Sequence, residues 1–330
     1  MTVSDIARAV GLSITTVSFI LNGKAKERKI SDRATKRVLD YVKRAGYKPS
    51  QFVRKVPVGQ EKVIGLLLPD LQDGFWLAVG KQLEHLAWEA GYRLVFMDYA
   101  GDRQKAAALT ALCVGKELDG VALFPPEHFE ESIVWLKERL PVVLLECYEP
   151  DLQCAYVVAD NRTAAYQVTK QLLDLDCKRI GFVSLYTNQT HLRERQQGYM
   201  DAVDASRLQA FIRKLDEGAP LAEIQEAVCE FVHDNRLDAV LFALNGLALP
   251  ALPGLQKASP DLRISTFDNH PVFDLLPVEP LLLCRDAAVY AQQIWEALCA
   301  GAEKAKGDVS QLSIPFSMRF STLIDSPLLE

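Results

Sequence analysis

The sequence predicts an all-α head with a helix-turn-helix, followed by an α/β body of two doubly wound parallel-sheet lobes. Residues 2–21 contain two short amphipathic segments on either side of Gly11, the spacing of two helices joined by a tight turn. From residue 63 onwards, short apolar runs alternate with segments of helical periodicity, as expected for parallel strands connected by covering helices. Charge divides the chain at the same region. Thirteen Lys and Arg against four acidic residues give residues 1–60 a net charge of +9, whereas the whole chain carries −6, which leaves −15 on residues 61–330.

The first helix has a start signal and an apolar face. Thr2 can cap it, and Ile6, Ala7 and Val10 recur at helical spacing. Gly11 suits the following turn because glycine adopts the left-handed conformation at little cost.

The second helix is expected to run from Ile14 to about Leu21 after a cap at Ser13. Val17 and Ile20 face the core together with Leu21, and the other side chains face outward. These outward side chains are Ile14, Thr15, Ser18 and Phe19. The second helix of such a motif enters the DNA major groove. An ordinary helical hairpin is the alternative, and the charge of +9 favours the DNA-binding interpretation.

A third helix is expected from a cap at Ser31 to about Ala45, with Val38 and Val42 on its inner face together with Ala45, and with Gly46 at its end. The basic connection before it, residues 24–29, is interpreted as a phosphate contact rather than a solvated loop. Such contacts add affinity and salt dependence but no sequence choice.

The segments IARAVGLSITTVSFILNG, GYKPS and VIGLLLPD resemble the lactose/galactose repressor family of bacterial transcription regulators, and NGKAKERKIS is similar to its fructose and sucrose repressor branch. The resemblance implies a homodimer that binds an approximately palindromic double-stranded operator. It also implies a body of periplasmic-binding-protein type. Between the lobes of that body a small sugar or sugar phosphate acts as effector, with a fructose phosphate as one candidate.

DNA contacts are expected at the start of the first helix, in the second helix, in the basic connection and in the hinge, and the resemblance implies those of the second helix and the hinge. The assigned residues are Thr2, Ser13, Ile14, Thr15, Thr16, Ser18, Phe19, Asn22, Lys24, Lys26, Ser50, Arg54, Lys55 and Val56. Ile14, Thr15 and Phe19 hold the positions that meet base edges. Because Ile14 and Phe19 are apolar, we expect contacts with thymine methyl groups, unless Phe19 packs inward. Val56 stands where the family has a leucine wedge, and Pro57 follows it, so a weaker minor-groove wedge is expected.

The body reads as two series of alternating strands and helices. Strands are expected at residues 63–69, 93–98, 120–124, 142–146, 155–160, 179–184, 210–215, 239–244 and 263–267, and helices at 75–90, 103–115, 129–138, 162–174, 192–204 and 221–233. With the family's crossovers, the predicted domains are a head at 1–48, a hinge at 49–60 and an effector-binding and dimerisation domain at 61–330. Its N-lobe comprises about 61–160 and 287–314, and its C-lobe about 161–286 and 315–330.

The resemblance implies an effector role for Asp160, Arg195 and Asp268. The full set of candidate effector residues lies mainly after the expected strands, where ligands bind in open α/β sheets. They are Asp70, Asp73, Phe75, Trp76, Asp160, Arg193, Arg195, Asn245, Asp268 and Arg285. Asp73 has an alternative role as a helix cap, with the two aromatic residues after it in a lobe interface. Arg193 has an alternative as plain surface charge, and Arg285 could face the cleft or pair with an acid.

Other features limit the function. No apolar run reaches the about 18 residues of a membrane span, and the start reads as a capped helix and not a signal segment, so we expect a cytoplasmic protein. The seven cysteines and five histidines show no metal-ligand spacing, and no phosphate- or dinucleotide-binding glycine motif occurs, so we expect neither metal nor cofactor.

A cytoplasmic solute-binding protein or an enzyme on the same body is the alternative. The basic head argues against the first, and the missing motifs argue against the second.

Overall fold

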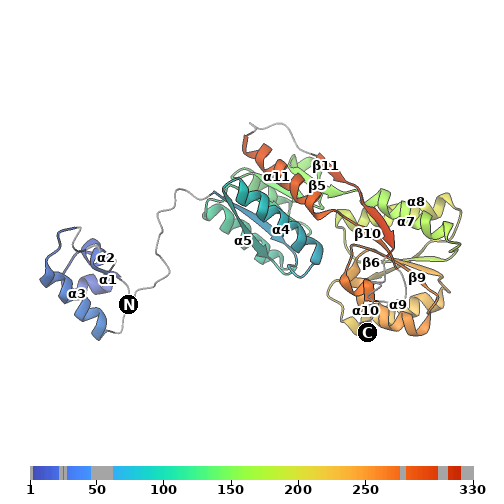
Figure 1. Ribbon diagram of the computed structural model, residues 1–330, viewed down its shortest axis with the longest axis horizontal. Coiled ribbons are helices and arrows are strands. Elements are labelled where there is room, and N and C mark those ends of the chain that lie inside the picture. The colour runs from blue at the N-terminus through green and yellow to red at the C-terminus, as the bar shows by residue number, and fades with distance from the viewer. Residues whose placement is uncertain are drawn as a thin grey trace, which may run out of the picture. The chain divides into compact units, whose positions relative to one another are not determined.

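The computed structural model describes residues 3–21, 25, 28–45, 62–275, 280–303 and 311–320. The chain divides into two compact units, residues 1–60 (the head) and residues 61–330 (the body), whose helices and strands are labelled in Figure 1. Within the described ranges, no helix has both the length and the apolar character needed to cross a membrane.

The head consists of three helices: α1 (Val3–Val10), α2 (Ile14–Leu21) and α3 (Asp32–Arg44). They pack around a small apolar core of Ile6, Ala7, Val10, Val17, Ile20 and Val38. Gly11 has a φ of +60°, as the tight turn requires. The predicted helix-turn-helix is therefore confirmed, although Leu21 is only half-buried and Ala45 is exposed. The predicted cap at Thr2 and helix end at Gly46 lie outside the described residues.

Two of the predicted helix caps in the head are formed. The Ser13 hydroxyl accepts a hydrogen bond from the backbone N–H of Thr16 at 3.1 Å, and the Ser31 hydroxyl accepts one from Ala34 at 3.3 Å. Each bond satisfies an N–H group that the first turn of a helix leaves without an intrahelical partner.

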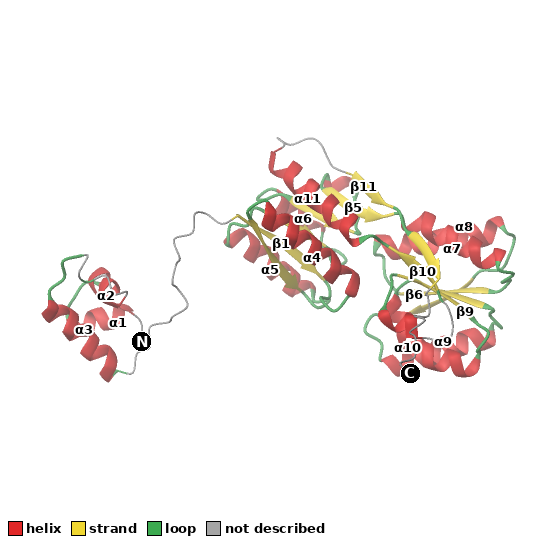
Figure 2. Cartoon of the chain, viewed as in Figure 1, coloured by secondary structure: helices red, strands yellow, loops and turns green. Residues whose placement is uncertain are grey.

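The N-lobe of the body is a parallel sheet with the strand order β11-β5-β4-β3-β1-β2. Its strands are β1 (Lys62–Leu68), β2 (Tyr92–Asp98), β3 (Gly120–Leu123), β4 (Val142–Leu145), β5 (Ala155–Ala159) and β11 (Gln311–Ile314). One face is covered by α4 (Gly74–Glu89) and α11 (Ala287–Glu303), and the other by α5 (Arg103–Gly115) and α6 (Glu130–Lys137) (Figure 2). Successive side chains of β1 point to opposite faces of this sheet. Ile64 and Leu66 pack in the apolar cluster beneath α4 and α11, and Leu67 packs in the cluster beneath α5 and α6.

The C-lobe sheet has the order β12-β10-β9-β8-β6-β7. Its strands are β6 (Ile180–Leu185), β7 (Phe211–Leu215), β8 (Ala239–Phe242), β9 (Arg263–Phe267), β10 (Leu281–Cys284) and the antiparallel β12 (Ser317–Phe320). α7 (Asn161–Asp174) and α8 (Thr190–Ala205) cover one face, and α9 (Leu221–Asp234) and α10 (Asn245–Ala258) cover the other. The two doubly wound lobes are as predicted.

The chain passes between the lobes three times: between β5 and α7, between β10 and α11, and between β11 and β12. The first two crossings leave from the carboxyl ends of parallel strands. Both sheets therefore direct these ends towards the boundary between the lobes, where ligands bind in open α/β sheets.

α10 was not predicted from the sequence. Pro250 and Pro253 lie inside it, and proline normally breaks a helix because it lacks an N–H donor and clashes with the preceding turn. The helix forms because its apolar side chains, including Leu247, Leu252 and Leu255, are buried in the C-lobe core. Tertiary packing outweighs local propensity here.

Gly198 in α8 allows a close approach to α7. An added Cβ would lie 2.1 Å from the backbone oxygen of Arg162, so Gly198→Ala must displace one helix from the other. We expect this variant to lose about 1–3 kcal/mol of unfolding free energy, the usual cost of overpacking. Chemical denaturation measures this loss. Gly115→Ala is the control, because nothing lies within 4 Å of a Cβ there. Equal stability of the two variants would contradict the close approach.

Candidate functional site

A cleft of about 770 Å³ lies between the two lobes of the body. Its walls are the segments that follow the strands of both sheets. From the N-lobe they include Asp70, Asp73, Trp76, Asp98, Phe124 and Glu146, and from the C-lobe Gln189, His191, Arg195, Glu217, Asp268 and Arg285. The cleft therefore lies where the topology places a ligand.

A buried ion-pair triad joins the lobes at this cleft. Arg285, directly after β10, donates through Nε and Nη2 to the two carboxylate oxygens of Asp268, at 2.9 and 2.6 Å. Its Nη1 donates to Glu146 of the N-lobe at 2.9 Å. The Arg285 guanidinium also stacks on Phe75, with Cζ 3.6 Å from the ring centroid. Burial opposes the charge on Arg285, but Asp268 and Glu146 outweigh it and raise the pKa of the guanidinium.

Both acids of the triad have left-handed backbone conformations, with φ of +52° at Glu146 and +62° at Asp268. Residues with side chains adopt this conformation at a cost of about 1–2 kcal/mol each. Both residues stand immediately after a strand, β4 and β9 respectively, where the turn directs the carboxylates to the same arginine. Strain of this kind persists where surrounding contacts hold it and is found at functional sites.

Glu146 links the triad to a second arginine. It accepts hydrogen bonds from the Tyr290 hydroxyl at 2.6 Å and from Nδ2 of Asn161 at 3.0 Å. The side-chain oxygen of Asn161 accepts a bond from Nε of Arg195 at 2.7 Å. Asn161 and Tyr290 lie directly after the first and second crossings, so this network spans the connection between the lobes.

Arg195 is fully buried in the C-lobe, with an exposed fraction of 1%. Its Nη1 donates to the carbonyl oxygen of Ala243 at 2.6 Å, and its Cζ lies 3.9 Å from the Phe267 ring centroid. Burial, together with the nearby charge of Arg285, lowers its pKa to about 10, so it stays protonated at neutral pH.

Aromatic residues form the N-lobe wall. Trp76 meets the rings of Phe75, Phe124 and Tyr290 edge-to-face, with centroids 5.3, 5.7 and 5.4 Å away. Asp73 caps α4, because its side chain accepts hydrogen bonds from the N–H groups of Phe75 and Trp76. It also lines the cleft, so both predicted roles of this segment occur together. Burial, and then the charge of Asp268, raises the pKa of Asp73.

His191 also lines the cleft, although it was not predicted from the sequence. It is buried, its ring meets Phe124 edge-to-face at 5.5 Å, and within the described part of the chain its Nδ1 has no hydrogen-bond partner. Burial, followed by the charges of Arg195 and Arg285, lowers its pKa well below the usual value. A signal was present in the sequence, because His191 precedes Arg195 by four residues and shares its helix face.

His191 should make stability depend on pH. The folded protein keeps it neutral, whereas the unfolded chain binds a proton below about pH 6.5, so folding weakens as the pH falls. Relative to His191→Phe, we expect the wild type to lose up to about 1.4 kcal/mol of unfolding free energy per pH unit below pH 6.5. Urea denaturation between pH 7.5 and 5.5 measures this difference. The exposed His233 provides the control variant His233→Phe. Parallel pH profiles of wild type and His191→Phe would refute the assignment.

Six of the ten predicted effector residues line the cleft, and four do not. Phe75 lies behind the cleft wall, stacked on Arg285. Asp160 instead caps α7, accepting a bond from the N–H of Thr163 at 3.3 Å, and Asn245 is the first residue of α10. Arg193 is two residues from Arg195 in α8, and this spacing places the two side chains on different helix faces.

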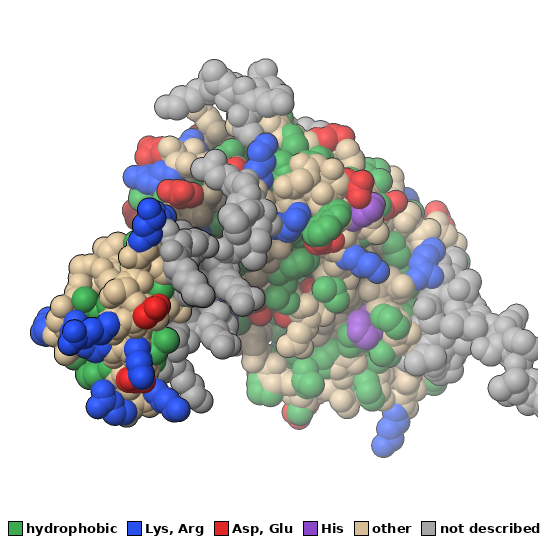
Figure 3. Space-filling model, turned by 60° about the vertical axis from the view of Figure 1, so that its left-hand side comes forward, with side chains coloured by type: hydrophobic (Ala, Val, Ile, Leu, Met, Phe, Trp, Pro, Cys, Tyr) green, Lys and Arg blue, Asp and Glu red, His purple; other side chains and the backbone are tan. Residues whose placement is uncertain are grey.

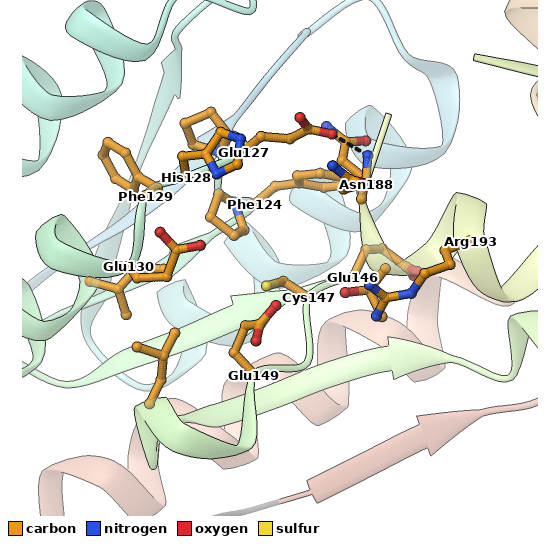
Figure 4. Close-up of a pocket in the computed structure, with 16 residues that line it drawn as sticks. Phe124, Glu127, His128, Phe129, Glu130, Glu146, Cys147, Glu149, Asn188 and Arg193 are labelled. Atoms are coloured by element: carbon orange, nitrogen blue, oxygen red, sulfur yellow. Dashed lines mark hydrogen bonds between the residues drawn. The ribbon is translucent and has the colours of Figure 1, made fainter. Parts of the chain in front are cut away.

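Arg193 lines a smaller side pocket of about 140 Å³, which shares Phe124, Glu146 and Gln189 with the cleft. Figure 4 shows this pocket with its four glutamates, Glu127, Glu130, Glu146 and Glu149. Glu127 of the N-lobe accepts hydrogen bonds from the Thr187 hydroxyl and from the N–H of Asn188, and so forms a second contact between the lobes.

Two further residues of the site, Glu146 and Tyr290, were not predicted from the sequence. Glu146 ends the run VVLLE and had the same signal as the selected residues, a polar side chain directly after a strand. Tyr290 gave no such signal, because it lies inside a helix. Across the described ranges, no group of three or more His, Cys, Asp or Glu side chains is arranged to hold a metal ion.

The head exposes the start of α2. Ile14 is 55% exposed and Thr15 is exposed, whereas Ser18 and Phe19 are half-buried. The Ser13 and Thr16 hydroxyls lie 2.8 Å apart. Arg28 stacks on Phe19, with Cζ 4.9 Å from the ring centroid. Lys and Arg side chains dominate the visible charge of the head in Figure 3. The other predicted DNA contacts, Thr2, Asn22, Lys24, Lys26, Ser50, Arg54, Lys55 and Val56, lie outside the described residues.

Comparison with known proteins gives two family matches. The bacterial regulatory proteins of the lacI family match residues 2–50, and the periplasmic binding proteins and sugar binding domain of LacI family match residues 61–259. The fructose operon regulatory protein of Vibrio cholerae is 25% identical over 284 residues, which cover 84% of this chain and 87% of that protein.

Two solved structures share the fold of the body. One is the periplasmic binding protein/LacI transcriptional regulator from Alkaliphilus metalliredigens QYMF complexed with D-xylulofuranose. It has a TM-score of 0.70 and 17% identity, and the match covers 80% of this chain and 100% of that chain. The other is the Cra transcriptional dual regulator from Pseudomonas putida in complex with fructose 1-phosphate, with a TM-score of 0.70 and 19% identity over 79% of this chain and 99% of that chain.

Proposed function

Because the chain belongs to the LacI family of bacterial regulatory proteins, which are DNA-binding transcriptional regulators with a sugar-binding domain, we propose that the inter-lobe cleft binds the effector. The observation that carries this proposal is the Glu146–Arg285–Asp268 triad, which joins the two lobes in the wall of the cleft. A ligand that binds among these groups changes the contacts between the lobes. It thereby favours one lobe arrangement over another.

In this proposal the effector controls operator affinity. A change in lobe arrangement repositions two DNA-binding heads, with a coupling free energy typically of about 1–3 kcal/mol. Residues 1–48 bind DNA, 49–60 form the hinge and 61–330 bind the effector and the partner subunit. Within 61–330, residues 61–160 and 287–314 form the N-lobe, and 161–286 and 315–330 form the C-lobe. The relatives complexed with D-xylulofuranose and with fructose 1-phosphate support a small sugar or a sugar phosphate as effector.

The proposed operator contacts combine base edges and phosphates. Exposed Ile14 and Thr15 are suited to bases, and Ile14 to thymine methyl groups. Arg28 covers Phe19, so this aromatic side chain presents less apolar surface than the sequence suggests. The hydroxyls of Ser13 and Thr16 are at the start of α2, where backbone phosphates are bound.

The protein is proposed to act as a homodimer in the cytoplasm, as a binding protein without catalytic activity. Two heads are needed to read the two halves of an approximate palindrome. Leu77 on α4 and Val95 on the edge strand β2 are 55% and 42% exposed, which supports the N-lobe as part of the dimer face.

The direct test is selection of operator DNA by the full-length protein. We expect binding of genomic DNA fragments at low salt, a steep fall with rising salt, and one recovered sequence that one metabolite releases or tightens. Electrophoretic mobility shift of the recovered fragment, with a scrambled sequence as control, measures this. A protein that binds no DNA at low salt would contradict the proposal.

A further inference from the structure

The mouth of the cleft is acidic. Asp70, Asp98 and Glu217 line it, and each is exposed or half-buried. The only basic side chains among the described residues of the cleft wall are Arg195, Arg285 and His191. Deeper in the cleft lie Asp73, Glu146 and Asp268. Six carboxylates thus face two guanidiniums and a neutral imidazole, a formal excess of four negative charges. The negative electrostatic potential of these carboxylates would repel an anionic ligand.

The two guanidiniums are already occupied. All three nitrogens of Arg285 donate to Asp268 or Glu146, and the face of the group is covered by Phe75. Arg195 donates through Nε and Nη1 to neutral oxygens, and its face lies over Phe267. It is the one cation of the described cleft wall without a carboxylate partner, and its single positive charge does not offset the three carboxylates of the mouth.

The side pocket adds no cationic subsite. Four glutamates line it against the single guanidinium of Arg193, which is exposed to solvent (Figure 4). A ligand that extended from the cleft past Glu146 into this pocket would again meet surplus negative charge. Neither part of the cavity therefore has the surplus of cationic donors that phosphate groups require.

The orphan nitrogen of His191 indicates what the cleft accepts instead. A buried polar atom without a partner is uncommon, and it marks a place where a bound group completes the hydrogen bonding. Burial, followed by the charges of the neighbouring Arg195 and Arg285, lowers the pKa of the imidazole and keeps it neutral. A neutral imidazole nitrogen pairs with a hydroxyl group, and the surplus carboxylates accept hydrogen bonds from further hydroxyls.

We propose that the effector is an uncharged polyhydroxy compound, a free sugar or polyol without a phosphate group, and that Nδ1 of His191 binds one of its hydroxyls. This inference rests on the proposed function, which leaves free and phosphorylated sugars open. Carboxylates that accept from hydroxyls, an arginine that donates to them and the aromatic wall around Trp76 are the groups that such a ligand needs.

The test compares matched ligands on the full-length protein by isothermal titration calorimetry and thermal unfolding. The pairs are fructose and fructose 1-phosphate, xylulose and xylulose 5-phosphate, and ribose and ribose 5-phosphate, with inorganic phosphate as an anion probe at constant ionic strength. We expect binding by a free sugar, at least about tenfold weaker binding of its phosphate ester, and no stabilisation by inorganic phosphate beyond a chloride control. Tighter binding of an ester, or saturable binding of inorganic phosphate that Arg195→Met abolishes, would overturn the proposal.

Two variants test the assigned groups. His191→Phe keeps an aromatic ring against Phe124 and should weaken free-sugar binding by about tenfold or more. The mouth variant Asp70→Asn/Asp98→Asn/Glu217→Gln removes three negative charges, keeps one acceptor oxygen on each side chain and should bind inorganic phosphate and phosphate esters more tightly than the wild type. Unchanged sugar affinity in the first variant, or unchanged anion affinity in the second, refutes the corresponding assignment. If instead the proposed function is wrong, the ligand would bind to the protein without altering its affinity for the operator.

Discussion

Arg285→Met is expected to lower the unfolding free energy of the body by about 3–5 kcal/mol, the usual cost of removing one partner from a buried ion pair. The substitution preserves side-chain length but leaves Glu146 and Asp268, both buried and both bonded to this guanidinium, without their shared cation. The resulting midpoint shift in guanidinium chloride denaturation measures the loss. The effector response should also fall, because the ion pair between the lobes is gone.

A neutralised triad separates the charge effect from the packing effect. In Glu146→Gln/Asp268→Asn/Arg285→Met no charge of the triad is left without its partner, so most of the lost stability should return. Asn161 and Tyr290 also donate to the Glu146 side chain, and a glutamine oxygen can still accept one of these bonds. If Arg285→Met costs less than about 1 kcal/mol, or if the triple variant is no more stable than the single one, the triad does not hold the lobes as described.

The fold followed from the sequence because local signals agreed with the global arrangement. Apolar runs such as VVLL in β4 and AVLF in β8 are buried on both faces, which only a covered parallel sheet allows. The resemblance to the lactose/galactose repressor family is confirmed by the family matches. The sequence did not predict α10, because two prolines mask a helix that C-lobe packing stabilises.

The site was predicted only in part because partners come from distant segments. Arg285 could be placed after a strand, but its pairing with Glu146, 139 residues away, depends on the crossing between the lobes that joins β5 to α7. A residue at the end of a strand can also stand at the start of the next helix. For this reason the Asp160 side chain accepts a hydrogen bond from a backbone N–H group of α7 and does not line the cleft. Side chains two positions apart in a helix point to different faces. Arg193 and Arg195 are therefore separated, although they looked equivalent in the sequence.

Removal of residues 1–60 is expected to abolish operator binding, with a loss of more than about 1,000-fold, while the body remains folded. The head has its own apolar core of residues from α1, α2 and α3, and the chain divides into compact units at residue 60. The deletion removes a net charge of +9 and leaves a body with −15, which repels DNA. Fluorescence anisotropy with labelled operator measures the loss.

The same truncated body tests whether the other proposed functions are independent of the head. Residues 61–330 contain the whole cleft and both exposed apolar residues of the proposed dimer face, so sugar affinity and sedimentation as a dimer should match those of the full-length protein. A second truncated body that carries Leu77→Asp should sediment as a monomer yet keep the cleft, because a charged side chain is costly to bury in a subunit interface. A monomeric or unfolded body without that substitution would show that the head or hinge contributes to assembly, and the modular arrangement would then be wrong.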